Sequence, residues 1–340
     1  MNQNGRGRPE TSERVALRMR ARGDTGTSTV IQSPGRDNAC VRAVSGRLVA
    51  PSPLVHNAAV IRPLDASARR DDRRRWNRRA RAWERWEPVF QHALAAVNPA
   101  LLRALELRPG MRVLDVGCGA GDPALEIAAW VRPRGRVVGI DIAAPMLATA
   151  RRRARLLGLT NAQFRRADLA SLRLRGRFDA LAARFSLMFA ADVGEALEQM
   201  RAALRPGGRA AIAVWAPLSA NPGSRLRDEA VRPFLREPPP DPESSPHPLR
   251  LGRPGLLPRL MRGAGFTSVT VQPVRVLWVY PSLDDYVRMQ IDSSLADLWQ
   301  KLSSRDRTRL SDRLRRGMVR YASDGPLRYP GKAWVASGRA

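Results

Sequence analysis

A glycine-rich turn at residues 117–121 constrains the fold of this chain more than any other feature of its sequence. The apolar run Val113–Val116 precedes the turn Gly117–Gly121, and a helix is expected to start near Asp122 and Pro123. Glycines at alternate positions permit a sharp turn and let the backbone approach a ligand closely. The turn therefore indicates a nucleotide-type cofactor at the end of a buried strand.

The charges around the turn favour a cofactor without phosphate. In the dinucleotide fingerprint G-x-G-x-x-G, a third glycine stands where this chain has Asp122. A carboxylate at the start of a helix would repel a pyrophosphate group, and Asp115 adds a second acid just before the turn. Two acids suit a cationic ligand such as S-adenosylmethionine, and they make a nucleotide-dependent dehydrogenase the weaker alternative.

Acidic residues close successive apolar segments of the chain. Strands are predicted at residues 136–141, 161–166, 178–183 and 210–215, with helices between them. This alternation predicts a parallel sheet with helices on both faces, and ligands bind beyond the carboxyl ends of such strands. Asp115, Asp141, Asp168 and Arg184 all fall at those ends. Each acid taken singly is also typical of a helix N-cap or a turn.

This pattern, with the strand and turn Val113–Gly121 as its hallmark, resembles the class I S-adenosylmethionine-dependent methyltransferases. The similarity is greatest to the small-molecule branch that includes the quinone-biosynthesis C-methyltransferases, and it covers residues 83–340. It implies a Rossmann-like, doubly wound α/β fold with a seven-stranded, mostly parallel sheet and helical cap insertions. It also implies S-adenosylmethionine as cofactor and methyl transfer by in-line displacement to a small, apolar or aromatic, quinone-like molecule.

The resemblance also assigns a set of cofactor-binding residues. Asp141 would bind the ribose hydroxyls, Ile142 and Met146 would lie against the adenine ring, and Asp168 would accept a hydrogen bond from the adenine amino group. The segment 184–189 would lie under the transferred methyl group. No catalytic base and no metal site are identified. The full set is Asp115, Gly117, Cys118, Gly119, Gly121, Asp141, Ile142, Met146, Ala167, Asp168, Leu169 and Arg184.

The sequence also predicts three regions of different character. Residues 1–75 are rich in Gly, Ser, Pro and Arg and are expected to form a disordered basic tail. Residues 76–110 are expected to be helical, because Trp83, Trp86, Phe90 and Leu94 recur at helical spacing. This aromatic stripe suits packing on the sheet and closure of the cofactor pocket equally well.

Residues 111–340 form the expected methyltransferase domain, with cap insertions at about 216–250 and 282–323. The first is rich in proline and is expected to be mostly loop, and the second is expected to be helical. Both would enclose the acceptor. Tyr280, Asp284, Asp285 and Tyr286 lie near the second cap, where such residues are more often helix caps or surface groups, so we assign them no catalytic role.

The net charge of +28 does not by itself indicate a nucleic-acid partner. Nearly all the basic residues are arginine, which points to a compositional bias, and a local basic run at residues 69–79 is typical of a solvated helix face or a disordered segment. A nucleic-acid-associated methyltransferase, or a non-catalytic cofactor-binding protein on the same fold, remains the alternative. The partner we expect is a small-molecule methyl acceptor.

The cysteine content and the lengths of the apolar runs indicate where in the cell the protein is expected. Cys40 and Cys118 are the only cysteines, so a disulfide framework is not expected, and no apolar run reaches the length of a membrane span. These features predict a soluble, cytoplasmic enzyme. They leave its oligomeric state and its acceptor atom open.

Overall fold

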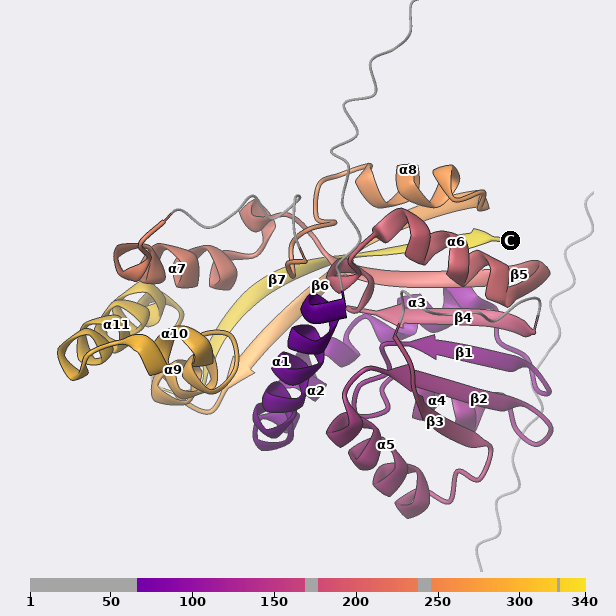
Figure 1. The fold of residues 1–340 in the computed structure, drawn as a ribbon, viewed down its shortest axis with the longest axis horizontal. Helices are drawn as coiled ribbons and strands as arrows, with labels where there is room; N and C mark the ends of the chain where they lie inside the picture. The colour runs from indigo at the N-terminus through magenta and orange to yellow at the C-terminus, as the bar shows by residue number, and fades with distance from the viewer. Residues whose placement is uncertain (1–65, 169–176, 238–245, 323–324) are drawn as a thin grey trace, which may run out of the picture. The chain divides into compact units, whose positions relative to one another are not determined.

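A seven-stranded sheet with the order β3-β2-β1-β4-β5-β7-β6 organises the described part of the chain (Figure 1). The computed structural model describes residues 66–168, 177–237, 246–322 and 325–340. The strands are β1 (Arg112–Val116), β2 (Arg136–Asp141), β3 (Ala162–Arg166), β4 (Phe178–Arg184), β5 (Leu204–Trp215), β6 (Thr267–Tyr280) and β7 (Leu327–Arg339). β1 to β5 pair in parallel, whereas β7 runs antiparallel to both of its neighbours. The predicted doubly wound, mostly parallel sheet is confirmed.

Helices cover both faces of this sheet because its central strands are apolar on both sides. Val113 packs on one face with helices α3 (Asn98–Leu105), α4 (Ala124–Trp130) and α5 (Ala144–Leu156). Leu114, the next residue, packs on the opposite face with α6 (Val193–Ala203) and α8 (Leu256–Gly263). Alternation along the strand thus divides the apolar residues between two cores.

The last two strands are longer than the sequence predicted. The apolar residues of the sequence indicate strands only at 268–274 and 333–337, but β6 and β7 stay paired as far as Tyr280 and Leu327. Their extensions run beyond β5 toward the cap helices (Figure 1). There Tyr280, Leu327 and Tyr329 belong to the core of the cap and are not packed against the sheet helices. The extra length therefore carries aromatic residues from the sheet into the cap.

The cap consists of α7 (Pro222–Val231), α9 (Leu283–Asp292), α10 (Ala296–Lys301) and α11 (Ser304–Met318). The helical character predicted for residues 282–323 is confirmed. The expectation of a mostly loop segment at 216–250 is wrong where α7 forms: Pro222 stands in its first turn, where proline is tolerated, and Leu226 and Ala230 are buried one turn apart. The prolines at 238–240 and 242 lie outside the described residues.

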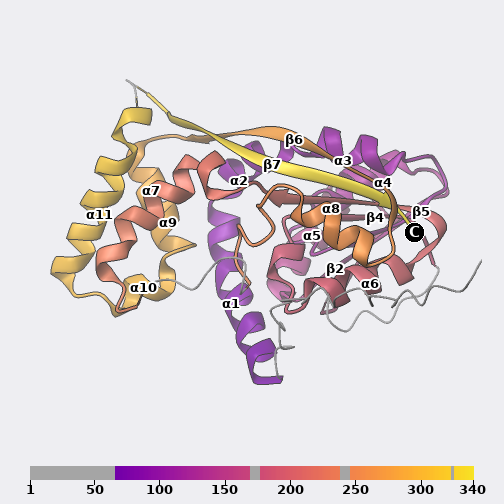
Figure 2. The same ribbon diagram turned by 90° about the horizontal axis from the view of Figure 1, so that it is seen from above.

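Three helices precede the sheet: α1 (Ala66–Arg85), α2 (Glu87–Ala95) and α3. The predicted helical segment therefore starts at Ala66, inside the range 1–75 that we expected to be disordered, and it includes the basic run at 69–79. Arginine and alanine are strong helix formers, which explains the longer helix. Figure 2 shows α1 lying between the cap helices and α5. The tail predicted at residues 1–65 lies outside the described residues.

A search of the described helices for a membrane span finds none that is sufficiently long and apolar.

Candidate active site

The glycine turn is held against β2 and β4 by contacts that exclude a side chain at Gly117. The amides of Gly117 and Cys118 both donate to the Ile140 carbonyl, at 2.8 and 2.9 Å. Gly117 has a φ of +69°, and a Cβ atom there would lie 2.2 Å from Cβ of Ser186. Ser186 is fixed in turn, because its Oγ donates to the Val116 carbonyl at 2.6 Å. The turn can follow this path only with glycine at 117.

Asp115 supports the turn from behind. Its side chain is fully buried, and Oδ2 accepts a hydrogen bond from the amide of Ala124 at 3.1 Å, at the start of α4. Burial raises the pKa of this carboxyl to about 7, and the positive charge of Arg184 opposes that rise. Neither Asp115 nor Gly121 is among the described residues that line the cavity beside the turn. Direct contact of either residue with a cofactor stays a prediction.

Asp141 joins the end of β2 to the glycine turn. Its Oδ2 accepts from the amide of Gly119 at 2.9 Å, and its Oδ1 accepts from the amide of Ala143 at 2.8 Å. Burial raises the pKa of this carboxyl, and the two amides oppose the rise by hydrogen bonding to its charged form. The carboxylate faces the cavity while holding both segments in place.

A cavity of about 390 Å³ opens at the carboxyl ends of the central strands. This volume lies within the range usual for small-molecule sites. The structure brings most of the predicted cofactor residues to it: Gly117, Cys118, Gly119, Asp141, Ile142, Met146, Ala167, Asp168 and Arg184. Leu169 lies outside the described residues.

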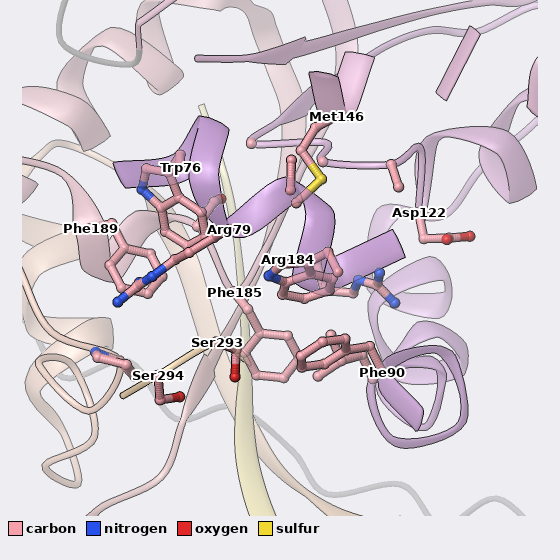
Figure 3. Close-up of a pocket in the computed structure, with 18 of the residues that line it drawn as sticks. Trp76, Arg79, Phe90, Asp122, Met146, Arg184, Phe185, Phe189, Ser293 and Ser294 are labelled. Carbon is pink, nitrogen blue, oxygen red and sulfur yellow. The ribbon is translucent and has the colours of Figure 1, made fainter. Parts of the chain in front are cut away.

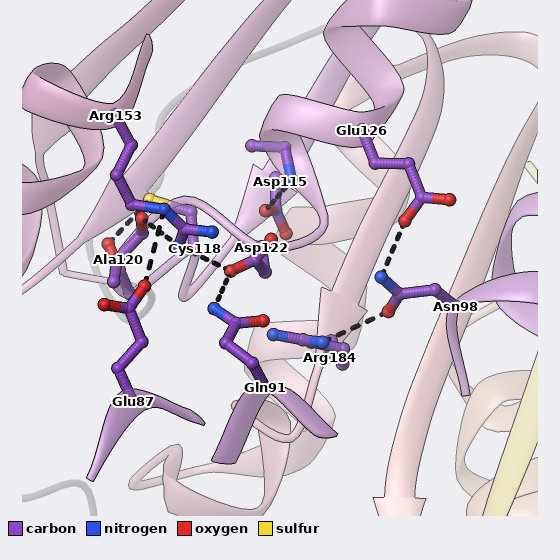
Figure 4. Close-up of polar contacts among 12 residues, drawn as sticks. Glu87, Gln91, Asn98, Asp115, Cys118, Ala120, Asp122, Glu126, Arg153 and Arg184 are labelled. Atoms are coloured by element: carbon purple, nitrogen blue, oxygen red, sulfur yellow. Dashed lines mark hydrogen bonds and ion pairs between the residues drawn. The ribbon is translucent and has the colours of Figure 1, made fainter. Parts of the chain in front are cut away.

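Asp122 lines the same cavity but is not a free carboxylate. It forms an ion pair with Nη1 of Arg153 at 2.6 Å and accepts a hydrogen bond from Nε2 of Gln91 (Figure 4). Arg153 also donates to the carbonyl of Ala120 in the turn and lies 3.6 Å from Glu87. Because Arg153 balances its charge, Asp122 would repel a phosphate less than the sequence alone suggested.

A second polar chain connects α3 to β4. Asn98 is buried, donates to Oε2 of Glu126 at 2.7 Å and accepts from Nη1 of Arg184 at 3.1 Å (Figure 4). Arg184 lines the cavity with a positive charge, although burial lowers its pKa. This role of Asn98 could not be predicted from the sequence, because the residue lies outside every motif and its partners are distant in the chain.

Helix α1 supplies aromatic residues to the cavity. Trp76 packs edge-on against Phe189, with 4.9 Å between ring centroids, and Trp83 stacks on Phe90 at 4.0 Å. Figure 3 shows Trp76, Arg79 and Phe189 grouped on one side of the cavity. Trp86 is not among the described lining residues; its indole N–H donates to Asp292 at 2.9 Å. Within the aromatic stripe, Trp83 lies at the cavity, and Phe90 packs against Trp278 of β6 at 6.2 Å. Trp86 does neither, because it contacts α9 of the cap.

A run of aromatic rings leads from the end of β4 toward the cap. Phe185 stacks on Trp215 at 4.3 Å, Trp215 lies 5.9 Å from Trp278, and Trp278 lies 6.2 Å from both Tyr280 and Tyr329. All five residues line the cavity. Of these five residues, only Phe185 falls in the segment 184–189 that the resemblance places under the transferred methyl group. The others come from the ends of three different strands, and the only available signal was their aromatic character.

The acids near the second cap have structural roles, as the sequence suggested. Ser282 caps the start of α9: its Oγ accepts from the amide of Asp285 at 3.0 Å and donates to the Asp285 carboxylate at 2.7 Å. Asp284 pairs with Arg315 on the surface. Tyr286 packs edge-on against Tyr280 at 5.4 Å. Tyr280 lines the cavity, and its hydroxyl lies 3.3 Å from that of Tyr329.

Part of this chain, including the glycine turn, matches a known protein family. Residues 107–232 match a family model described as a methyltransferase domain. Nocamycin O-methyltransferase of Saccharothrix syringae is 29% identical over 258 residues, which is 72% of this chain and 88% of that protein. Demethylmenaquinone methyltransferase of Thermus thermophilus is 41% identical over 115 residues, which is 34% of this chain and 51% of that protein. The solved structure of the Bacillus YcgJ protein has 19% identity and a TM-score of 0.48, covering 72% of this chain and 97% of its own.

The domain match, the strand order and the glycine turn together identify the chain as a methyltransferase. Its similarity to nocamycin O-methyltransferase and to demethylmenaquinone methyltransferase supports the class I, S-adenosylmethionine-dependent branch whose members act on small molecules. S-adenosylmethionine is accordingly its methyl donor.

Proposed function

We propose that this enzyme transfers the methyl group of S-adenosylmethionine to a small, apolar, ring-bearing acceptor of aromatic or quinone-like character. One observation carries the proposal: the same cavity is lined by the predicted cofactor residues and by the rings of Phe185, Trp215 and Trp278. Aromatic side chains bind flat ring systems by stacking and edge contacts. Donor and acceptor would therefore meet beside Phe185.

The cofactor half of the cavity suits the parts of S-adenosylmethionine. Each oxygen of Asp141 already accepts one amide and has a further lone pair for a ribose hydroxyl. Ile142 and Met146 would pack on the adenine ring, and Asp168 would receive its amino group. The cation of Arg184 would attract the carboxylate of the methionine part. Asp115 would act indirectly, by fixing the turn and α4.

Methyl transfer depends more on the alignment of acceptor and methyl donor than on an activated side chain of the protein. S-adenosylmethionine supplies a methyl carbon bound to a sulfonium leaving group, which departs as a neutral thioether when the nucleophile attacks in line. The protein holds the acceptor along that line and excludes water, which the aromatic walls and the rings of Trp76 and Trp83 accomplish. Burial raises the pKa of Tyr280 and Tyr329, so both phenols stay protonated at neutral pH and cannot serve as bases.

We also propose that the two cap insertions enclose the acceptor. We further propose, from the sequence, that the enzyme is located in the cytoplasm. The cap assignment is supported by Arg227 of α7 and by Met289 of α9, since both line the cavity.

Methyl transfer from labelled S-adenosylmethionine tests the proposal. The purified full chain should label an apolar ring compound such as reduced naphthoquinone or 2-naphthol, and should not label a saturated aliphatic alcohol. Asp141→Asn should reduce the label by about tenfold or more, because one carboxylate oxygen becomes a donor facing a backbone amide. Label found only in added nucleic acid or protein would contradict the proposal and favour the nucleic-acid-associated alternative.

A further inference from the structure

Helix α9 turns a polar side chain with unused hydrogen-bonding capacity toward the cavity. Gln290 is 5% exposed and lines the cavity. Its Oε1 is buried and has no hydrogen-bond partner among the described residues. Buried side-chain oxygens are paired in the great majority of cases, and an unpaired one destabilises the fold. This carboxamide is therefore suited to pair with a bound molecule.

Three hydroxyl groups that line the cavity with Gln290, those of Ser293, Tyr280 and Tyr329, already have polar partners. The hydroxyl of Ser293 donates to the carbonyl of Met289 at 2.6 Å, one turn back on the same helix. The hydroxyls of Tyr280 and Tyr329 lie 3.3 Å from each other. Among the described residues of α9, the hydroxyl of Tyr286 and Oε1 of Gln290 are buried without a hydrogen-bond partner. Of these two residues, Gln290 lines the cavity and Tyr286 does not, so the Gln290 carboxamide is the group placed to pair with the contents of the cavity.

The surroundings limit what such a molecule can be. Three buried tyrosines pack together here: Tyr286 of α9 contacts Tyr280 and Tyr329 edge-on. Trp278 lies 5.9 Å from Trp215 and 6.2 Å from both Tyr280 and Tyr329. Burial raises the pKa of each of these phenols, so they add no negative charge at neutral pH. An apolar ring fits this wall, and a neutral hydroxyl on the ring fits the amide, because a hydroxyl can donate to Oε1 or accept from Nε2.

We propose that Gln290 selects methyl acceptors that carry a ring hydroxyl, by hydrogen bonding to that hydroxyl at the cap end of the cavity. The inference rests on the proposed function and adds a specificity residue that no sequence motif marks. A site that holds a buried polar group discriminates strongly against analogues that cannot pair with it.

Two matched ligands test the inference: 2,6-dihydroxynaphthalene, and 2,6-dimethoxynaphthalene, which has the same ring but no donor. Calorimetric titration into the full chain saturated with S-adenosylhomocysteine should show the dihydroxy compound binding about tenfold or more tightly. In Gln290→Leu this ratio should fall to within about twofold. The control is Gln300→Leu, which changes an exposed glutamine on α10 and should keep the wild-type ratio of the two affinities.

Thermal unfolding separates lost recognition from damage to the fold. Without ligand, Gln290→Leu should raise the Tm by about 2–4 °C, because it replaces an unpaired buried amide by an apolar group of similar size. An unchanged ligand ratio in this variant would overturn the inference, as would a wild-type chain that binds S-adenosylhomocysteine and neither naphthalene. Failure of the wild-type chain to bind S-adenosylhomocysteine would overturn the proposed function as well.

Discussion

At the scale of single residues, the cofactor turn depends on a position that tolerates no side chain. Gly117 combines a left-handed backbone with close contact to Ser186, whereas Gly158, at the end of α5, has a similar φ of +62° and open space around it. Substitutions at these two glycines therefore distinguish the effect of backbone strain from the effect of a steric clash.

Gly117→Ala should weaken S-adenosylhomocysteine binding by at least about tenfold. The new Cβ would lie 2.2 Å from Cβ of Ser186, so the turn or β4 must move. Gly158→Ala carries only the strain of a left-handed alanine, about 1–2 kcal/mol of stability, and should leave binding unchanged. Titration calorimetry and thermal unfolding measure the two effects. Equal affinities for the two variants would contradict the role of the Ser186 contact.

Asp115 makes stability depend on pH. Its pKa is about 7 in the folded chain against 3.8 as the ordinary value, chiefly because of burial. The folded chain therefore holds this proton at pH values where the unfolded chain has released it. The stabilisation is complete below about pH 4 and is lost as the pH rises toward 7, at about 1.4 kcal/mol per pH unit.

Asp115→Asn should remove this dependence. The asparagine oxygen can still accept from the amide of Ala124, and no charge is buried. The wild-type chain should lose about 2–3 kcal/mol relative to the variant between pH 5 and pH 7, as measured by urea unfolding at each pH. Parallel pH profiles for the two proteins would show that Asp115 does not titrate in this range.

At the scale of elements, the N-terminal helices are joined to the site by polar contacts. Asn98 of α3 links Glu126 of α4 to Arg184 of β4, and Gln91 of α2 reaches Asp122. These contacts hold the helices, the glycine turn and the cationic side of the cavity in one arrangement. Asn161 offers a comparison, because its amide also makes two hydrogen bonds, to the carbonyls of Ala128 and Gly135, away from the cavity.

Asn98→Ala should lower both stability and cofactor affinity, because it leaves Arg184 without this hydrogen-bond acceptor. We expect a loss of about 1–3 kcal/mol in unfolding free energy and a fivefold or greater rise in the Kd for S-adenosylhomocysteine. Asn161→Ala should lose similar stability with unchanged Kd. A normal Kd for Asn98→Ala would mean that this chain of contacts supports the fold alone.

At the scale of the whole molecule, the two halves of the cavity differ in how far the sequence could predict them. The cofactor half is built from short strand-to-helix segments, so Asp141 and Gly119 lie within one local pattern and could be placed before the structure was known. The acceptor half joins Phe185, Trp215 and Trp278, which are far apart in the chain. The periodicity of apolar residues describes one segment at a time, so it cannot predict contacts between residues that are far apart in the chain.

The same reason explains the errors in the outer elements. Helix α7 is short and begins with Pro222, and its burial comes from contacts with α11 across the cap. The ends of β6 and β7 are stabilised by the cap core. Val276–Tyr280 is a continuous apolar run, and Pro330 and Gly331 interrupt the apolar pattern of β7. Where tertiary contacts stabilise a helix or strand, local propensity predicts it to be shorter than it is or misses it.

Calorimetric titration of the full chain with S-adenosylhomocysteine tests the central claim most directly. We predict saturable binding to one site with a Kd of order micromolar, weakened by at least about tenfold in Asp141→Ala because the ribose contact and the anchor of the Gly119 amide are lost together. NAD titrated in the same way should give no saturable heat. Absence of S-adenosylhomocysteine binding, or tight NAD binding in its place, would contradict the account.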